Sequence, residues 1–208
     1  MYITSLTTLA CLASTALSHG VITKPTPRGP GAASLAACGP SVTNNIKGDL
    51  TSHVEDLPEA AAKDSLYQGA AACNLWLCRG LQFADNTKNV QNWMVGQKVP
   101  IEVNIRIRHV GIANVSIIDT KSDKYVKGGE GLLVWSKGYA DESVRGSLPA
   151  NQTMFDVVVP DLGESCKVAG ECVLQWWWYG TKARQTYESC IDFVIQPTPM
   201  VKSRHFSF

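Results

Sequence analysis

The fold of this chain is decided by the stretch Val99-Pro-Ile-Glu-Val-Asn-Ile-Arg-Ile-Arg-His109. Its odd positions from 101 to 107 are apolar and its even positions from 102 to 108 are polar, which is the alternation of a half-buried β-strand. A second alternation follows, in which Ala113, Val115 and Ile117 stand between polar neighbours. These residues predict two neighbouring strands, each with one apolar face turned towards a core.

Outward from this pair, the ranges 132–135, 153–159, 173–179 and 186–195 read as further short strands, separated by Gly and Pro. The prolines of 24–31 favour an extended edge segment or a turn-rich entry. Residues 38–97 are irregular, with short helices expected at 54–62 and 65–72, and 119–131 reads as a polar loop. We predict an all-β fold, an immunoglobulin-like or fibronectin-III-like antiparallel β-sandwich with a long disulfide-held loop region carrying short helices.

Aromatic residues form a run from Trp176 to Tyr179 on one predicted strand. Because alternate side chains of a strand point to opposite faces, some of these rings must be buried, and we assign the run to the core rather than to a sugar-binding platform. The aromatic residues of the predicted loops are as well placed to touch a substrate: Tyr67, Trp76, Trp93 and Tyr139.

Residues 1–18 carry no charge and contain a short apolar run that ends in Ala16-Leu-Ser18, a pattern that signal peptidase accepts. The run is too short to cross a bilayer as a helix. We therefore predict a signal peptide at 1–18, a secreted, extracellular domain at 19–197 and a short tail at 198–208. The net charge of +1 gives no indication of nucleic acid or membrane as a partner, and we expect a monomer.

Six cysteines remain after Cys11 is removed with the leader, and an even set in a secreted chain indicates three disulfides. Six cysteines allow 15 pairings, among which sequence alone does not choose. Cys166 and Cys172 could close one turn, and for the others we favour Cys38 with Cys73 and Cys78 with Cys190. Two sequons predict glycosylation at Asn114, which we expect to point outward, and at Asn151.

Cleavage after Ser18 would make His19 the first residue, which then offers a metal both its α-amine and its imidazole. A second histidine would complete three nitrogens in a T-shape, and this nitrogen-rich set suits copper(II). His109 is the natural partner, because it has the apolar parity of its strand and lies at the strand end. The alternatives are an exposed terminal His19 and a core His109 bound to a backbone carbonyl. We expect His53 and His205 to be solvated, with His53 as the reserve ligand.

A third element is Gln185-Thr-Tyr187, in which Tyr187 shares a strand face with the apolar residues Ile191 and Phe193. A tyrosine in that place is commonly a core residue with a hydrogen-bonded hydroxyl. Near copper it could instead occupy the weak axial position, and Gln185 could place its amide beside a bound oxygen species.

Three motifs together resemble the lytic polysaccharide monooxygenases, which are secreted copper enzymes with a histidine brace: His19-Gly-x-Ile-x-x-Pro-x-Pro-Arg28, His109, and Gln185-x-Tyr187-x-x-Cys190. The similarity runs from 19 to about 195 and is greatest to the fungal group called auxiliary-activity family sixteen, which is associated with cellulose. It implies copper held by the amine and ring of His19 and by His109. It also implies an axial Tyr187 and a Gln185 that positions oxygen or hydrogen peroxide.

The resemblance further implies oxidative cleavage of β-1,4-glycosidic bonds with an external electron donor, with cellulose as the expected polymer and chitin as a possible one. Related cellulose-active enzymes carry a histidine several residues before the Gln-x-Tyr motif, whereas this chain has Gln175-Trp-Trp-Trp178. The proton donor would therefore differ. Two other functions stay open: a brace protein that binds copper without acting on polysaccharides, and a carbohydrate-binding module without catalysis.

Overall fold

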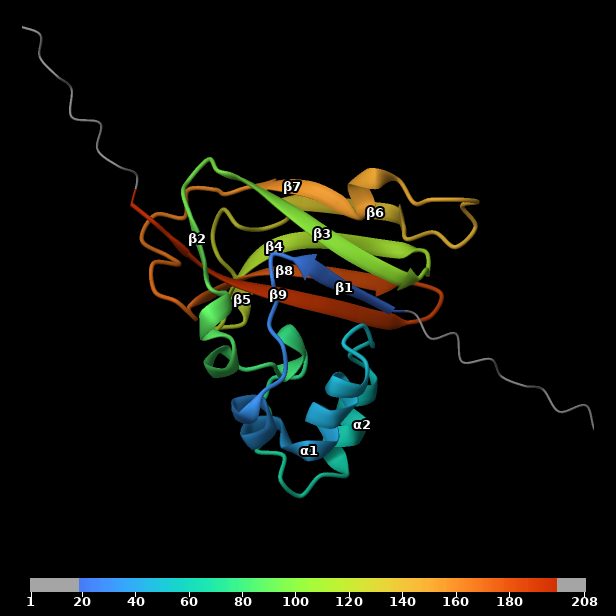
Figure 1. Cartoon of the computed structure of the whole chain (residues 1–208), viewed down its shortest axis with the longest axis vertical. Coiled ribbons are helices and arrows are strands. Elements are labelled where there is room, and N and C mark those ends of the chain that lie inside the picture. Colours follow the sequence, from blue (N-terminus) through green and yellow to red (C-terminus); the bar gives the residue numbers. More distant parts are fainter. Residues whose placement is uncertain (1–18, 198–208) are drawn as a thin grey trace, which may run out of the picture.

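The computed structural model describes residues 19–197, so the predicted signal peptide, the tail and His205 lie outside the described residues. Nine strands form most of the domain, as Figure 1 shows. They are β1 (His19–Lys24), β2 (Gln91–Trp93), β3 (Lys98–Ile107), β4 (Gly111–Asp119), β5 (Lys124–Tyr125), β6 (Leu133–Tyr139), β7 (Met154–Val158), β8 (Cys172–Gly180) and β9 (Gln185–Ile195). Two α-helices and four 3₁₀ turns complete it: α1 (Ala32–Gly48), α2 (Asp56–Ala62), η1 (Cys78–Gly80), η2 (Phe83–Asp85), η3 (Thr87–Asn89) and η4 (Ala150–Gln152).

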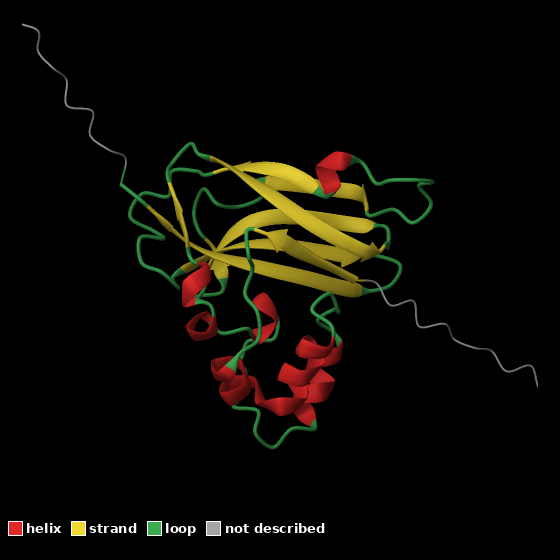
Figure 2. Cartoon of the chain, in the orientation of Figure 1, coloured by secondary structure: helices red, strands yellow, loops and turns green. Residues whose placement is uncertain are grey.

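The strands form two sheets that pack into a β-sandwich, which confirms the predicted fold class. One sheet has the order β1-β3-β7, and the larger sheet has the order β2-β9-β8-β4-β5, with β6 also paired to β4. The pairs are antiparallel except β2 with β9. Both α-helices lie on one side of the sandwich, outside the larger sheet (Figure 2). No helix among residues 19–197 is long and apolar enough to cross a membrane.

Alternation along β4 and the first part of β3 fills the core as the sequence predicts, but Ile105 is only half-buried and Ile107, at the end of β3, is exposed. Val99, Ile101 and Val103 of β3 are buried, as are the apolar odd residues of β4. The short β1 lies at the edge of its sheet, which suits the proline-rich segment that follows it. Two ranges differ. The expected loop 119–131 contains the two-residue strand β5, which pairs with the end of β4, and the expected irregular range 38–97 contains β2, which pairs with β9.

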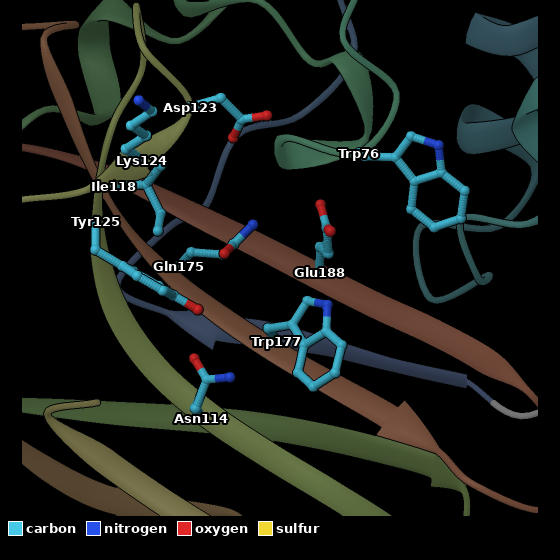
Figure 3. Close-up of a pocket in the computed structure, with 9 residues that line it drawn as sticks. All are labelled: Trp76, Asn114, Ile118, Asp123, Lys124, Tyr125, Gln175, Trp177 and Glu188. Carbon is cyan, nitrogen blue, oxygen red and sulfur yellow. The ribbon is translucent and has the colours of Figure 1, made fainter. Parts of the chain in front are cut away.

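The tryptophan run on β8 divides between the two faces of the sheet, so its assignment to the core is confirmed only for the inward-facing rings. Trp176 and Trp178 are buried in the core, while Trp177 is half-buried on the outer face (Figure 3). The expectation that Trp93 and Tyr139 touch a substrate is wrong, because both are buried. Trp93 stacks on Phe193 with ring centroids 4.6 Å apart, and the Tyr139 hydroxyl donates a hydrogen bond to the Gln152 carbonyl at 2.7 Å.

Tyr67 and Trp76, the other two loop aromatics, differ in exposure. Tyr67 is half-buried and its hydroxyl donates a hydrogen bond to the Cys73 carbonyl at 3.0 Å, so it supports the loop region from inside. Trp76 is exposed over about half of its surface. It therefore remains available to a ligand, as the sequence suggested.

The helical region contains one helix that was not predicted and lacks one that was. Helix α1 covers 32–48, but Gly39 with φ 76° and Pro40 put a kink in it, which breaks the periodic pattern by which a helix is recognised. Helix α2 confirms the expectation at 54–62. The helix expected at 65–72 is wrong, because the Asp64 carboxylate accepts the backbone N–H groups of Ser41 and Leu66 and holds this stretch in turns.

Three disulfides connect the parts, and all three expected pairings are confirmed. Cys38–Cys73 closes the helical region, Cys166–Cys172 closes a turn before β8, and Cys78–Cys190 joins the irregular region to β9. Leu77, Ile118 and Val173 pack with the Cys78–Cys190 pair as a small buried cluster. The Cys78–Cys190 disulfide therefore holds the irregular region against the larger sheet.

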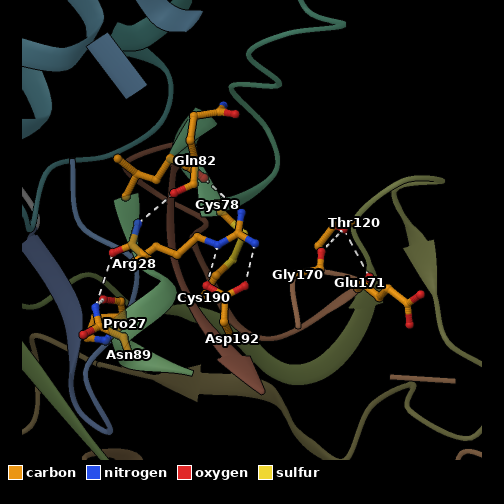
Figure 4. Close-up of polar contacts among 12 residues, drawn as sticks. Pro27, Arg28, Cys78, Gln82, Asn89, Thr120, Gly170, Glu171, Cys190 and Asp192 are labelled. Atoms are coloured by element: carbon orange, nitrogen blue, oxygen red, sulfur yellow. Dashed lines mark hydrogen bonds and ion pairs between the residues drawn. A yellow bond between two sulfur atoms is a disulfide. The ribbon is translucent and has the colours of Figure 1, made fainter. Parts of the chain in front are cut away.

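Arg28 holds the proline-rich segment after β1 on strand β9 (Figure 4). Its Nε and Nη2 donate hydrogen bonds to the two carboxylate oxygens of Asp192 at 2.8 and 2.7 Å, and its Nη1 donates to the Leu81 carbonyl at 3.0 Å. Both charged side chains are almost fully buried. Because a planar guanidinium satisfies both carboxylate oxygens, the buried charges are paired and the segment is fixed in direction.

A close backbone approach at Gly111 gives a test of the pairing between β4 and β8. A Cβ at Gly111 would lie 1.9 Å from the Tyr179 carbonyl oxygen, so Gly111→Ala should lower the free energy of unfolding by at least about 2 kcal/mol. Gly29→Ala is the control, because nothing lies within 4 Å of its added Cβ, and it should change stability by less than about 0.5 kcal/mol. Urea unfolding measures both variants, and equal stabilities would contradict the pairing of β4 with β8.

Candidate metal centre

His19 is the first residue of β1 and lies in antiparallel register with Ile107 of β3. Its side chain is buried, and its Nε2 lies 2.6 Å from Oδ2 of Asp49. The structure therefore does not present His19 as an exposed terminal side chain. One of its two ring nitrogens interacts with a carboxylate.

Asp49 comes from the C-terminal end of α1 and was not singled out from the sequence. Its Oδ1 accepts the backbone N–H of Thr51 at 2.8 Å, and the Thr51 carbonyl accepts the backbone N–H of Gly20 at 3.0 Å. Burial raises the pKa of Asp49. The hydrogen bonds from Thr51 and the nearby His19 lower it by more, so the net pKa lies below its ordinary value. Asp49 is therefore an ionised partner for the imidazole at neutral pH.

His109 is half-buried in the connection 108–110 and lies outside β3, which ends at Ile107. The parity argument from the strand therefore does not apply to it. Hydrogen bonds fix the connection instead; among them, Val110 N–H donates to Glu142 Oε2 at 2.6 Å, and Thr181 N–H donates to the Val110 carbonyl at 3.0 Å. Because Ile107 pairs with His19, His109 follows at the same end of the sandwich.

Gln185 and Tyr187 come together at the start of β9, as their spacing suggested. The Tyr187 hydroxyl donates a hydrogen bond to Gln185 Oε1 at 2.8 Å, and the buried Tyr187 ring stacks on Trp178 with centroids 4.4 Å apart. The backbone of β1 lies over the same indole, because a Cβ at Gly20 would be 3.1 Å from the Trp178 ring. Trp178 therefore packs between the His19 strand and Tyr187.

Pairing across the sheets completes this end of the sandwich. Gly180, the last residue of β8, pairs with both Gln185 and Gly111, and a Cβ at Gly180 would lie 3.2 Å from the His109 Cβ. His109 therefore lies beside the Gly180–Gln185 pair, where β9 begins. The four predicted site residues gather at one end of the domain.

The expectation that His53 is solvated is wrong. His53 is buried, its Nδ1 lies 3.3 Å from Glu55 Oε2, and its ring lies edge-on to Tyr187 with centroids 6.3 Å apart. The cause is Glu55, whose carboxylate accepts the backbone N–H of Thr186 at 2.9 and 3.0 Å and so folds this segment over β9. Burial raises the pKa of Glu55, but hydrogen bonds from His53 and Thr186 outweigh burial and leave it below its ordinary value.

The residues of this end could hold a metal if the chain supplied one further donor. Among residues 19–197, no three His, Cys, Asp or Glu side chains are placed to hold a metal ion. A metal at His19 and His109 would therefore need a donor of another type, and a terminal amine at His19 is one. Two imidazoles and an amine fit copper(II), which prefers nitrogen ligands in a tetragonal arrangement.

The two sequons differ in exposure. Asn151 is exposed within η4, as glycosylation requires. The Asn114 side chain lies on the outer face of the sheet, as expected, where it is half-buried and accepts a hydrogen bond from the buried Ser116 hydroxyl at 3.0 Å. The loop region covers this face of β4. Glycosylation at either site stays a prediction.

Residues 19–193 match the sequence profile of a family described as "Lytic polysaccharide mono-oxygenase, cellulose-degrading". No curated protein matches the chain. Among solved structures, a lytic polysaccharide monooxygenase from Jonesia denitrificans is 16% identical with a TM-score of 0.40, and the match covers 86% of this chain and 100% of that one. A cellulose-active, copper-bound monooxygenase is 14% identical with a TM-score of 0.40 and the same coverages.

A monooxygenase from Streptomyces lividans is 12% identical with a TM-score of 0.34, and the match covers 50% of this chain and 58% of that one, which is less than two thirds of its length. None of the matches given above supports the predicted closeness to auxiliary-activity family sixteen. That placement stays a prediction.

Proposed function

Because this chain belongs to the lytic polysaccharide mono-oxygenase family, whose profile covers residues 19–193, we propose that it oxidises β-1,4-linked polysaccharide, with cellulose as the polymer. The observation that carries the proposal is the pairing of His19 with Ile107, two residues before His109. It brings two imidazoles to one end of the sandwich beside Gln185 and Tyr187. Bound copper would supply the one-electron chemistry by which an external donor and oxygen or hydrogen peroxide hydroxylate a sugar carbon beside the glycosidic bond.

In this proposal the chain is secreted and cleaved after Ser18, so that His19 carries a free α-amine. Asp49 interacts with Nε2 of His19, and a metal at this residue would therefore use Nδ1. Nδ1 is the ring nitrogen nearer to the main chain, so it closes a chelate ring with the residue's own amine. His109 supplies the third nitrogen.

Tyr187 and Gln185 act as a pair next to this donor set. Tyr187 is fixed by its stacking on Trp178 and by its edge-on contact with His53, so a metal held by the two histidines would have a rigid phenol side chain beside it. Gln185 accepts the Tyr187 hydroxyl through Oε1, which turns its amide NH₂ group away from the phenol. That group can then donate to oxygen or hydrogen peroxide.

A direct test is the product analysis of copper-loaded protein with ascorbate and cellulose. We expect oxidised cello-oligosaccharides by mass spectrometry, and their loss in His109→Ala. If the loaded protein binds one copper but releases no oxidised products from cellulose or chitin, the chain is a copper-binding protein without this activity. If it binds cellulose equally well without copper and yields no such products, it is a carbohydrate-binding module.

Asp49 provides a prediction about the metal ligand itself. Asp49→Asn should weaken copper(II) binding by about 10-fold to 100-fold, because a carboxylate that holds a metal-binding imidazole orients the ring and raises its basicity. Calorimetric titration with copper(II) measures the affinity. Asp161→Asn is the control, because Asp161 accepts a similar turn hydrogen bond from Gly163 between β7 and β8 and should leave the affinity unchanged. Equal affinities in both variants would contradict the role of Asp49.

A further inference from the structure

The outer face of the larger sheet carries a cavity of about 640 Å³ (Figure 3). This volume lies within the roughly 300–1,000 Å³ range of small-molecule sites. Side chains reach it from β4, β5, β8, β9 and the loop before η1. Those used in the argument are Trp76, Tyr125, Gln175, Trp177 and Glu188.

The cavity lies on the opposite side of the sheet from the buried face of the candidate metal centre. Successive residues of a strand point to opposite faces, so Tyr187 enters the core and Glu188 points to the outer face. Trp177 pairs with Glu188, which places both on this outer face. A ligand in the cavity therefore does not need the metal.

Aromatic side chains are concentrated at this cavity. Among residues 19–197, the two aromatic residues that are exposed both line it: Trp76 is 51% exposed and Tyr125 is 55% exposed. Trp177 adds a third ring, stacked on Tyr179 with centroids 6.1 Å apart. Exposed aromatic faces are uncovered apolar surfaces that pack well against the C–H faces of a ligand.

The floor of the cavity carries polar groups that are almost fully buried. Glu188 is 5% exposed, and its Oε2 has no hydrogen-bond partner. Gln175, also buried, lies next to it on β8. Burial raises the pKa of Glu188 to about 8, so its carboxyl group is mostly protonated at neutral pH. A buried carboxyl oxygen without a hydrogen-bond partner is costly, so a ligand group that hydrogen-bonds to it gains affinity beyond what its contact area gives.

Together these groups select one class of ligand. Asp123 and Lys124 line the same cavity with opposite charges, so its lining has no single sign of charge that would select an ion. A purely apolar ligand would leave Glu188 Oε2 without a hydrogen-bond partner. A neutral sugar satisfies both parts, because its hydroxyl groups donate to Glu188 and exchange hydrogen bonds with Gln175 while its C–H face covers an indole or phenol ring.

We propose that this cavity is a binding site for a neutral β-linked oligosaccharide, separate from the metal centre. A pyranose ring packs on Trp76 and Tyr125, and its hydroxyl groups reach Glu188 and Gln175. The site would hold a soluble chain or a loose chain end on the outer face of the sheet. It goes beyond the proposed oxidation, because it requires neither copper nor His19.

Titration of the copper-free, full mature protein with cellotetraose tests the proposal, with intrinsic tryptophan fluorescence and calorimetry as readouts. We expect saturable binding with a dissociation constant of about 1 mM or below. Trp76→Ala and Tyr125→Ala should each weaken it by about tenfold, while Trp76→Tyr keeps an aromatic face and most of the affinity. Leu66→Ala removes an apolar side chain of similar exposure, 58%, outside the cavity and should have no effect.

His19→Ala separates this site from the proposed function, because it should abolish copper binding and leave cellotetraose binding intact. Chitotetraose is tested in parallel as a sugar with the same ring faces. The proposal would be overturned by the absence of saturable binding of either sugar up to about 10 mM. Binding that is lost in His19→Ala but unchanged in Trp76→Ala and Tyr125→Ala would also overturn it, while leaving the metal centre in place.

Discussion

A chain that keeps Ala16-Leu-Ser18 ahead of His19 should bind copper(II) at least about 100-fold more weakly than a chain that begins at His19. The extension leaves both imidazoles in the protein but moves the α-amine three residues away from His19. One of the three proposed nitrogens is then lost together with its chelate ring. No side chain among residues 19–197 replaces it, since no three metal-binding side chains are placed together there.

Competition with a chelator of known copper affinity measures the difference between the two chains. Their melting temperatures serve as the control and should agree, because the extension lies before β1. His109→Ala should weaken binding in the chain that begins at His19. If the extended chain binds copper as tightly as the processed one, the amine is not a ligand.

Loss of the Cys78–Cys190 disulfide should give the largest change in stability. The bond joins residues 112 positions apart, and the constraint on an unfolded loop of that length is worth about 4 to 5 kcal/mol. The pair also packs in the cluster that holds the irregular region on the larger sheet. We expect the double variant Cys78→Ser, Cys190→Ser to unfold at a much lower temperature and to lose the packing of His53 against Tyr187.

Cys166→Ser with Cys172→Ser is the matched control, because this disulfide spans only 6 positions and its constraint is worth about 2 kcal/mol. Calorimetric unfolding compares the two double variants. Loss of the long-range disulfide should lower the free energy of unfolding by more than loss of the short-range one. A larger loss from the Cys166–Cys172 pair would show that the irregular region is held mainly by other contacts.

The sandwich could be predicted because its signals are local. The alternation from Val99 to Val103 and in β4 records which face is buried, and the prolines after Ile22 mark an edge. Ile107 has the same parity but is exposed at the end of β3. Tyr187 could likewise be assigned to the core side from strand parity. Helix α1 escaped prediction because Gly39-Pro40 interrupts its pattern.

The site could be predicted only in part, because its supporting residues meet through the fold. An Asp-x-Thr sequence at Asp49 indicates a turn, but nothing local places that turn against His19, 30 positions earlier. His53 was assigned to solvent because its burial depends on Glu55 binding the backbone of Thr186. The sequence places His109 on the apolar face of a strand, but that strand ends at Ile107. Its predicted position at the end of the sheet is correct.

The central claim is that the processed chain holds one copper(II) through the amine and ring of His19 and the ring of His109. The most direct measurement is the electron paramagnetic resonance spectrum of the copper(II) protein that begins at His19. The account predicts one tetragonal site per chain whose hyperfine structure shows three nitrogen donors, with one donor fewer in the chain that keeps Ala16-Leu-Ser18. An identical spectrum from the two chains would contradict it.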